Sequence, residues 1–290
     1  MYKDKSFNSD ISIEKINYST FFSTPKVMGI LNITNNSFYD GGKFIKESSI
    51  IEQCKKMIEE GVDIIDIGAC SSKPGSSPVE EKKEIEIIKK YTKLIKQKFP
   101  KTIISVDTFR SSVAEIAIEN NADIINDISA GKFDSKIFDV VAKNNLPYIL
   151  MHMQGEPKSM QEKPTYKNII RELLDFFEKK INFLNNKGIK KIIIDPGFGF
   201  GKSLKDNYTI LKNIEKFQKF GYPIIAGVSR KSMLTKLLDI DSKDALNSTT
   251  IVNTIALTKG CKVLRVHDVK QAKEILKILD YLKQSSLHFF

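Results

Sequence analysis

Short apolar runs alternate along the chain with longer segments in which apolar residues recur at helical spacing. The runs are rich in Ile and Val and lack strict polar alternation, which is typical of parallel strands buried on both faces. Eight runs are predicted as strands, at residues 27–33, 62–67, 102–106, 123–128, 147–151, 191–194, 223–228 and 263–266.

The intervening segments are predicted as helices. The segment at 79–98, for example, opens with acidic residues and closes with lysines, which suits the helix dipole. The predicted helices cover residues 49–60, 79–98, 111–119, 135–143, 168–186, 204–217, 231–238, 245–259 and 269–282. Eight strands that alternate with helices favour one closed (β/α)8 TIM barrel over an open sheet, although two helices lie between the last two strands.

We expect a single barrel domain. It would span residues 27–284, after an N-terminal extension at 1–26 that forms a short cap or hairpin and before a tail at 285–290. No repeat, low-complexity tract or linker divides the 290 residues, and such barrels take about 250 residues as one unit.

Composition narrows the class of protein. The chain is 41% hydrophobic and 28% charged, and no run reaches the roughly 18 apolar residues of a membrane span. The net charge of +11 could indicate nucleic-acid binding, but lysine supplies nearly all of it and no RRM, KH or zinc-finger pattern is present. We therefore expect neither a nucleic-acid partner nor a membrane. Cys54, Cys70 and Cys261 form no CxxC pair, which favours the reducing cytoplasm.

Polar side chains recur where the predicted strands end. They are Asn32, Asp66, Asp107, Asn126, Asp127, His152, Asp195, Ser229, Arg230, Lys231, Arg265 and His267. A single such residue often only caps the next helix. In a barrel, however, all eight strands end at the face that carries the catalytic loops, so a polar group after each strand favours an active site.

The charges at these strand ends fall into two groups. Asp66, Asp107 and Asp195 suit a ligand rich in N–H donors, such as an aminopyrimidinone ring. Lys231, Arg265 and His267 suit an anion such as a phosphate. A fused heterocycle that carries a phosphate ester satisfies both demands. The glycine-rich segment 195–202 permits close backbone approach to such a ligand but matches neither a P-loop nor a GxGxxG fingerprint.

Ordered motifs at these positions carry a resemblance to a known family. They are 28–34 (MGILNIT), 66–68 (DIG), 71–75 (SSKPG), 105–108 (SVDT), 125–128 (INDI), 151–155 (MHMQG), 195–202 (DPGFGFGK), 227–233 (GVSRKSM) and 265–269 (RVHDV). Together they resemble dihydropteroate synthase, and the resemblance runs from about Val27 to Leu282.

The resemblance implies a reaction. The family joins p-aminobenzoate to 6-hydroxymethyl-7,8-dihydropterin diphosphate and releases diphosphate and 7,8-dihydropteroate, a folate precursor, with the help of Mg²⁺. It thus implies a transferase, a target of sulfonamides, and a homodimer, which is the usual state in the family. Several loop positions depart from the usual family pattern. Asn35 and Asn36 replace a proline and an aspartate, Cys70 replaces a carboxylate, and Lys73 replaces an arginine.

The resemblance also implies roles for individual residues. The pterin would be bound by Asp107, Asn126, Met151, Asp195, Phe200 and Lys231. The p-aminobenzoate would be bound by Phe38, Ser72, Pro74, Phe200 and Ser232. The diphosphate would be bound by Asn32, Lys73, Arg265 and His267, with Asn32 also meeting the magnesium ion. The catalytic set would be Asp107, Asp195, Lys231, Arg265 and His267.

Two alternatives remain beside this reading. A pterin-binding methyltransferase barrel would share the aspartates but not the 229–233 run, and a non-catalytic pterin-binding paralogue would not need Lys231, Arg265 and His267. Two residues are also open in role: His152 is either a core histidine or a substrate contact, and Lys202 either binds substrate or closes the glycine-rich segment.

Overall fold

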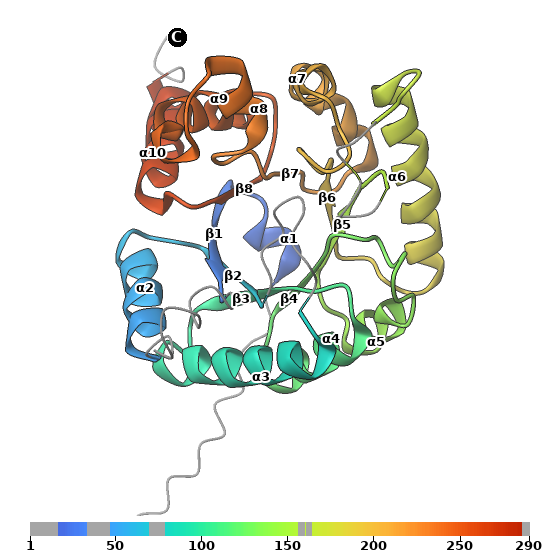
Figure 1. The fold of residues 1–290 in the computed structure, drawn as a ribbon, viewed down its shortest axis with the longest axis vertical. Helices are drawn as coiled ribbons and strands as arrows, with labels where there is room; N and C mark the ends of the chain where they lie inside the picture. The colour runs from blue at the N-terminus through green and yellow to red at the C-terminus, as the bar shows by residue number, and fades with distance from the viewer. Residues whose placement is uncertain (1–16, 34–46, 70–78, 156–159, 161–163, 286–290) are drawn as a thin grey trace, which may run out of the picture.

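The fold is an eight-stranded parallel barrel surrounded by helices (Figure 1). It was determined as a computed structural model that describes residues 17–33, 47–69, 79–155, 160 and 164–285. The strands are β1 (Lys26–Asn32), β2 (Ile64–Gly68), β3 (Ile103–Asp107), β4 (Ile124–Asp127), β5 (Tyr148–Met151), β6 (Ile192–Asp195), β7 (Ile225–Ala226) and β8 (Val263–Val266).

All strand pairs are parallel, in the order β6-β5-β4-β3-β2-β1-β8-β7. A bridge between Ile194 and Ile224 brings the two ends of this sheet together and closes the barrel. The predicted (β/α)8 TIM barrel is therefore confirmed.

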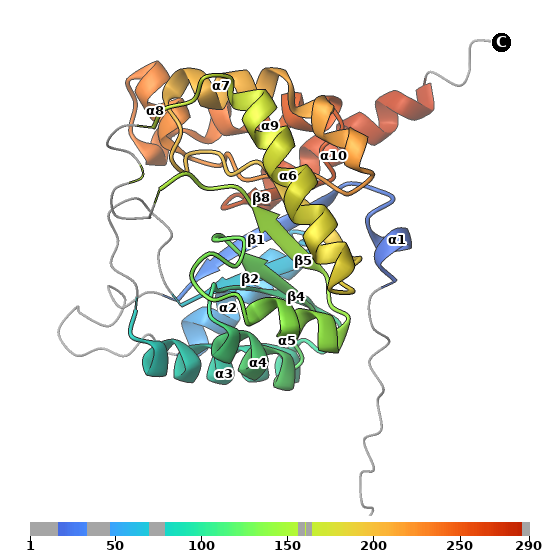
Figure 2. The ribbon, with the colours of Figure 1, turned by 90° about the vertical axis from the view of Figure 1, so that its right-hand side faces the viewer.

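Helices cover the outside of the barrel, as Figures 1 and 2 show from two directions. The α-helices are α1 (Tyr18–Phe21), α2 (Glu47–Glu59), α3 (Glu81–Lys98), α4 (Ser111–Glu119), α5 (Ile137–Asn144), α6 (Ile169–Asn186), α7 (Leu204–Lys212), α8 (Ser232–Leu238), α9 (Leu246–Thr258) and α10 (Val269–Ser285). Short 3-10 helices, η2 (Ile214–Phe220) and η3 (Ser242–Asp244), lie between α7 and β7 and between α8 and α9.

Two predicted elements differ in the structure. The helix expected over 204–217 divides at Asn213, whose side-chain amide bonds to the carbonyl of Thr209 one turn back, and the chain continues as η2. The strand expected over 223–228 shortens to β7, because Pro223 has no N–H for a ladder and Gly227 follows the strand.

The barrel interior is built from two layers of contrasting chemistry. The lower layer is apolar and takes one side chain from each strand: Met28, Ile64, Ile103, Ile124, Ile149, Ile193, Ile225 and Val263. One pleat further along, several inward positions are polar, and Asp66 on β2 and Asn126 on β4 are joined by a hydrogen bond across the interior. The apolar layer therefore forms a floor beneath a polar chamber at the C-terminal ends of the strands.

The outward positions of the same strands are also apolar. On β2, Ile65 and Ile67 belong to the large core between the sheet and the helices. Ile64 is part of the floor, and Asp66 points into the chamber. Burial on both faces explains why the strands showed no polar alternation in the sequence.

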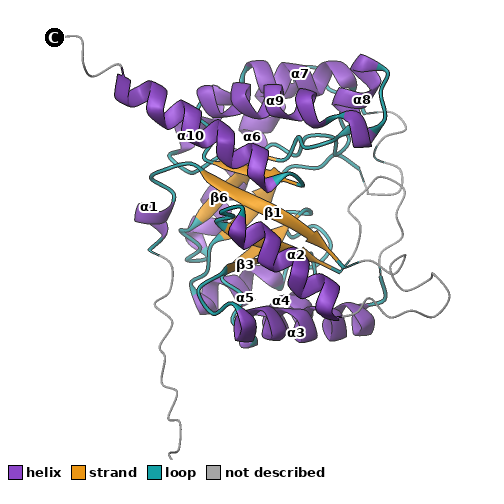
Figure 3. Ribbon diagram, turned by 90° about the vertical axis from the view of Figure 1, so that its left-hand side faces the viewer, coloured by secondary structure: helices purple, strands orange, loops and turns teal. Residues whose placement is uncertain are grey.

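Helix α1 covers the floor from below. Phe22 is buried against the floor residues, with Tyr18 and Phe21 beside it, and the Tyr18 hydroxyl donates a hydrogen bond to the carbonyl of Ile192. Figure 3 shows α1 at the end of the barrel where the strands begin. Residues 18–22 thus seal the bottom of the barrel.

Because Phe22 seals this floor, Phe22→Ala should lower the free energy of unfolding by about 3–5 kcal/mol. Leu237→Ala is the surface control, since Leu237 is 55% exposed, and it should change stability by less than about 0.5 kcal/mol. Chemical denaturation followed by circular dichroism compares the two. Equal losses for the two variants would show that α1 does not seal the floor.

Candidate active site

A cavity of about 490 Å³ opens at the C-terminal ends of the strands. Six residues that the sequence assigned to a site line it: Asn32, Phe200, Lys231, Ser232, Arg265 and His267. They come from β1, the segment after β6, the turn between β7 and α8, and the end of β8. The volume is that of a small-molecule site.

Four further predicted residues contact this wall from behind. Asp107 pairs with Arg265, and the acidic group of Asp195 interacts electrostatically with Lys231. Asn126 reaches Arg265 through Asp66, and Met151 forms a small buried cluster with Met160 and Phe200. The remaining predicted site residues, Phe38, Ser72, Lys73 and Pro74, lie outside the described residues.

Arg265 ties three strands together across the chamber. Its Nε donates to Asp66 Oδ2 at 2.7 Å and its Nη2 donates to Asp107 Oδ2 at 3.0 Å, so β8 is bonded to both β2 and β3. Asn126 Nδ2 adds a bond from β4 to the same Asp66 oxygen at 3.1 Å. The Asp66 carboxylate, which the sequence assigned to a ligand rich in N–H groups, is thus fully buried. Its Oδ2 is engaged within the protein, whereas its buried Oδ1 has no hydrogen-bond partner among the described residues.

These bonds set the charges of the chamber. Burial raises the pKa of the Asp107 carboxyl to about 7, although the nearby Arg265 lowers it. Burial alone would lower the pKa of Arg265, but the Asp66 and Asp107 carboxylates raise it overall, so the guanidinium stays charged. The chamber therefore holds one fixed cation and one carboxyl that changes its charge near neutral pH.

Lys231 brings a second cation to the cavity. Its Nζ donates to the carbonyl oxygen of Phe198 at 2.5 Å and lies 4.8 Å from the centre of the Phe200 ring. Burial lowers the pKa of the ammonium to about 8, although Asp195 raises it. Lys231 is thus poised over the flat face of Phe200, beside the Asp195 carboxylate.

Lys202 closes the glycine-rich segment rather than lining the cavity. Its buried Nζ donates to the carbonyl oxygens of His152 and Phe200 at 3.1 and 3.0 Å and lies 3.2 Å from His152 Nδ1. Burial lowers the pKa of Lys202 to about 7 and that of His152 to about 3. Lys202 and His152 are thus buried against each other and outside the cavity lining. His152 is a core histidine in this structure, and Lys202 closes the glycine-rich segment.

The glycine-rich segment passes so close to the end of β5 that two of its glycine positions have no room for a side chain. Gly197 has a φ of +71°, and a Cβ there would lie 2.0 Å from the carbonyl oxygen of His152. A Cβ on Gly201 would lie 2.2 Å from the carbonyl oxygen of Gln154. Asn207 Oδ1 also accepts the N–H of Gly199 at 2.7 Å, so the segment is held from both sides.

His267 completes the cavity wall at the end of β8. Its Nδ1 lies 3.0 Å from Ser229 Oγ, and its backbone N–H donates to the same oxygen at 3.2 Å. Ser229 thereby holds the imidazole beside Arg265 and Lys231. Cations from two neighbouring strand ends converge on one cavity, as expected for an anion site.

Sequence reasoning missed one part of the wall. Ile240, Asp241 and Ser242 line the cavity, although they lie after α8, up to the first residue of η3, rather than at a strand end. No motif or periodicity marks them, because only the return of the chain after α8 brings them back to the cavity.

The comparisons with known proteins agree with this geometry. The model of the family described as pterin binding enzyme matches residues 28–267. The dihydropteroate synthase of Haemophilus influenzae is 40% identical over 258 residues, which are 88% of this chain and 93% of that protein. The chain belongs to the dihydropteroate synthase family.

Solved structures of the family share the fold. The Yersinia pestis dihydropteroate synthase, crystallised with a sulfonamide drug, superposes with a TM-score of 0.85 at 35% identity over 91% of this chain and 96% of that one. The Xanthomonas albilineans enzyme, crystallised with 4-aminobenzoic acid, superposes with a TM-score of 0.83 at 31% identity over 90% and 94%. Within the described residues of this chain, no helix is long and apolar enough to cross a membrane.

The tight approach at Gly197 predicts a large effect of a single methyl group. Gly197→Ala should destabilise the protein by about 3 kcal/mol or more and disorder the segment that carries Phe198 and Phe200. Gly188→Ala is the matched control, because Gly188 has a φ of +86° but no atom within 4 Å of its Cβ position. Backbone strain alone should cost that variant about 1–2 kcal/mol. Thermal unfolding of both variants measures the two losses of stability. Equal losses would contradict the tight approach at Gly197.

The perturbed groups predict how pterin affinity depends on pH. Asp107 should take up a proton below about pH 7, and Lys231 should lose one above about pH 8. If the ligand needs the carboxylate and the ammonium, affinity is greatest between these values and falls on both sides. Calorimetric titration across this range measures it. Asp107→Asn should weaken binding at every pH and remove the acid limb, because the amide does not titrate. A flat wild-type profile, or an acid limb that survives in this variant, would refute the assignment.

Proposed function

We propose that this chain condenses p-aminobenzoate with 6-hydroxymethyl-7,8-dihydropterin diphosphate to give 7,8-dihydropteroate and diphosphate in folate biosynthesis. One observation supports this most: a single cavity is lined by Lys231, Arg265 and His267 and backed by the carboxylates of Asp107 and Asp195. A cavity with cations in its wall and acids behind them matches a basic heterocycle that carries an anionic leaving group.

The pterin would occupy the part of the cavity nearest the barrel chamber. Asp195, Asp107 and Asn126 would meet the N–H groups of its ring, and Met151 would support it from the buried cluster with Phe200. Lys231 would contact the ring from the side of Phe198 and Phe200.

The diphosphate would meet the basic part of the wall, formed by Asn32, Arg265 and His267, with Lys73 as a further contact. Nε and Nη2 of Arg265 are already bonded to carboxylates, so the diphosphate would take the rest of the guanidinium. These cations would stabilise the negative charge that grows as diphosphate leaves, while Asp107 and Asp195 would favour the cation left on the pterin methylene.

Magnesium fits this arrangement as a partner of the diphosphate. Asn32 offers one amide oxygen to the cavity, and no cluster of three acidic, histidine or cysteine side chains suited to a metal occurs among the described residues. Mg²⁺ commonly takes most of its ligands from phosphate oxygens and water, so one protein oxygen suffices. When bound, the ion would add positive charge beside the leaving group.

The p-aminobenzoate would lie outside the pterin, between Phe200 and Ser232. Phe200 presents an aromatic ring, and Ser232 begins α8 at the cavity wall. Phe38, Ser72 and Pro74 would complete this pocket. Sulfonamides would compete there, and the neutral aniline nitrogen would attack the pterin methylene after diphosphate has left.

The cytoplasm is the compartment that we propose. Cys54 and Cys261 are both free and buried, and burial raises the pKa of the Cys54 thiol to about 12. Two unreactive core thiols suit a reducing environment.

The direct test supplies both substrates with magnesium and measures dihydropteroate and diphosphate. Stoichiometric formation of the two products supports the proposal. Pterin binding without product would instead favour a non-catalytic paralogue, and methyl transfer from a reduced pterin donor would favour a methyltransferase barrel.

Asp195→Asn should abolish pterin binding while the fold survives. The amide oxygen can still accept the Gly197 N–H, which Asp195 Oδ1 now accepts at 2.7 Å, but the residue loses its second acceptor and its charge. We expect affinity to fall by about 100-fold or more, given roughly 1.5–3 kcal/mol for each charge-assisted bond. Calorimetry with a pterin analogue measures this, with Asp175→Asn on the exposed face of α6 as control. Unchanged affinity would remove Asp195 from the site.

A homodimer is the assembly that we propose, formed through an α9–α10 patch of Ile251, Ile255, Ile278, Tyr281 and Leu282. These side chains are 37% to 74% exposed. Ile251 and Ile255 lie four residues apart on α9, and Tyr281 and Leu282 lie three and four residues after Ile278 on α10, so each set lies on one side of its helix. Helices α9 and α10 pack side by side, as Figures 1 and 2 agree. A second copy of the same patch would bury this apolar surface.

Ile278→Glu should convert the dimer to a monomer, because the new charge would be buried against the partner subunit. Sedimentation velocity at micromolar concentration measures the state. Phe133→Glu is the control, since Phe133 is an apolar residue with 37% exposure that lies far from α10 in the chain. A wild-type monomer, or a variant that remains dimeric, would contradict this interface.

A further inference from the structure

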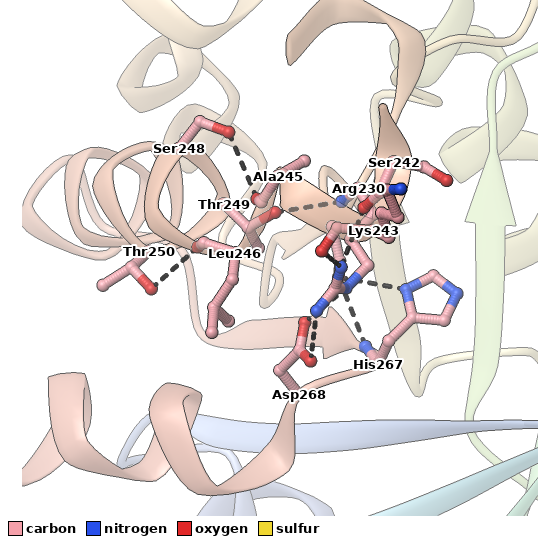
Figure 4. A network of polar contacts seen from close by, with 11 residues as sticks. Arg230, Ser242, Lys243, Ala245, Leu246, Ser248, Thr249, Thr250, His267 and Asp268 are labelled. Carbon is pink, nitrogen blue, oxygen red and sulfur yellow. Dashed lines mark hydrogen bonds and ion pairs between the residues drawn. The ribbon is translucent and has the colours of Figure 1, made fainter. Parts of the chain in front are cut away.

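Arg230 lines the cavity, yet its guanidinium donates hydrogen bonds to other groups of the protein (Figure 4). Its Nε and Nη2 donate to the two carboxylate oxygens of Asp268 at 2.8 and 2.9 Å. Its Nη1 donates to the carbonyl oxygens of Ser242 and Lys243 at 2.8 and 2.6 Å. Four N–H groups are thus engaged, so this arginine is poorly placed to bind a substrate anion.

The backbone of Arg230 is constrained as well. Its φ of +53° lies in the left-handed region, which residues other than glycine adopt at a cost, and its N–H donates to Thr249 Oγ1 at 3.0 Å. Glycine would adopt this backbone conformation at a lower energetic cost than arginine. The guanidinium bonds explain why an arginine is accommodated there.

These contacts join three segments that are distant in the sequence. One is the turn after β7, with Ser229 and Lys231, and another is the end of β8, with His267 and Asp268. The third is the wall at 240–242, which continues into η3. Two contacts connect the turn after β7 with the end of β8: Ser229 lies against His267, and Arg230 pairs with Asp268.

We propose that Arg230 and Asp268 are a positioning pair that holds the 240–242 wall against the Lys231 side of the cavity and so sets the affinity for the outer substrate. The inference rests on the proposed function, in which that substrate is p-aminobenzoate between Phe200 and Ser232. The pterin lies deeper, on Asp195 and Asp107, and does not depend on this wall.

The geometry explains why an arginine is required. A planar fork satisfies a carboxylate with two bonds while its third nitrogen reaches two carbonyl oxygens, whereas a lysine ammonium is a single point donor. Arg230→Lys should therefore not rescue the function of the pair, and Asp268→Asn should mimic its loss.

Steady-state kinetics with each substrate varied separately tests the proposal. Arg230→Met, Arg230→Lys and Asp268→Asn should each raise the KM for p-aminobenzoate by about tenfold or more, because misplacement of a wall by about 1 Å has effects of this order. The Kd of a pterin analogue should change by less than about twofold. The double variant Arg230→Met with Asp268→Asn should be no worse than either single variant, as for two residues that act as one unit. Arg171→Met, on the exposed face of α6, is the matched control.

Three outcomes would overturn the proposal: an unchanged KM for p-aminobenzoate, an equal loss of pterin affinity, or additive effects in the double variant. Amide hydrogen exchange provides a measurement that does not depend on turnover. Exchange at 240–246 should accelerate in Arg230→Met relative to α6, and unchanged exchange would also overturn the proposal. If the wild-type chain made no dihydropteroate, the proposed function would fail, while the exchange result would still decide whether the pair positions the wall.

Discussion

The bonds from Arg265 to Asp66 and Asp107 are the interaction on which the polar chamber depends. Three charged groups stand directly above an apolar floor, where an unpaired ion would be strongly destabilising. Each pairing offsets the burial of the other, and Asn126 bonds to the same carboxylate of Asp66. The barrel can therefore place charge in its interior only as a connected set. Burial in this set raises the pKa of the Asp107 carboxyl to about 7, because the nearby Arg265 only partly offsets the loss of water around the carboxylate.

A second connected set holds the opposite side of the cavity. Lys202 fixes the glycine-rich segment to the end of β5, and the same segment presents the carbonyl of Phe198 and the ring of Phe200 to Lys231. The two lysines do different work although they lie close together in the fold. Lys202 is buried and bonded in full by the protein, whereas Lys231 faces the cavity, so only the second is placed to meet a ligand.

The arginines divide in the same way. Arg265 and Arg230 both line the cavity and both pair with aspartates. Part of the Arg265 guanidinium is free to bind a ligand in the cavity. The N–H groups of Arg230 instead donate to Asp268 and to the backbone carbonyls of η3. A charged residue in a cavity wall is therefore a ligand-binding group only if its hydrogen-bonding groups are not already committed.

The sequence by itself determined the fold and most of the candidate site. Burial on both faces produced apolar runs that could be read as parallel strands, and a barrel delivers every strand end to one face, so Asp107, Asp195, Lys231 and Arg265 followed from their positions alone. Only the tertiary structure decided how these groups pair. The pairing of Asp66 with Arg265, the burial of His152 with Lys202, and the wall at 240–242 each depend on contacts between segments far apart in the chain. Local periodicity carries no information about such contacts, because they are set by the way the helices return the chain to the barrel.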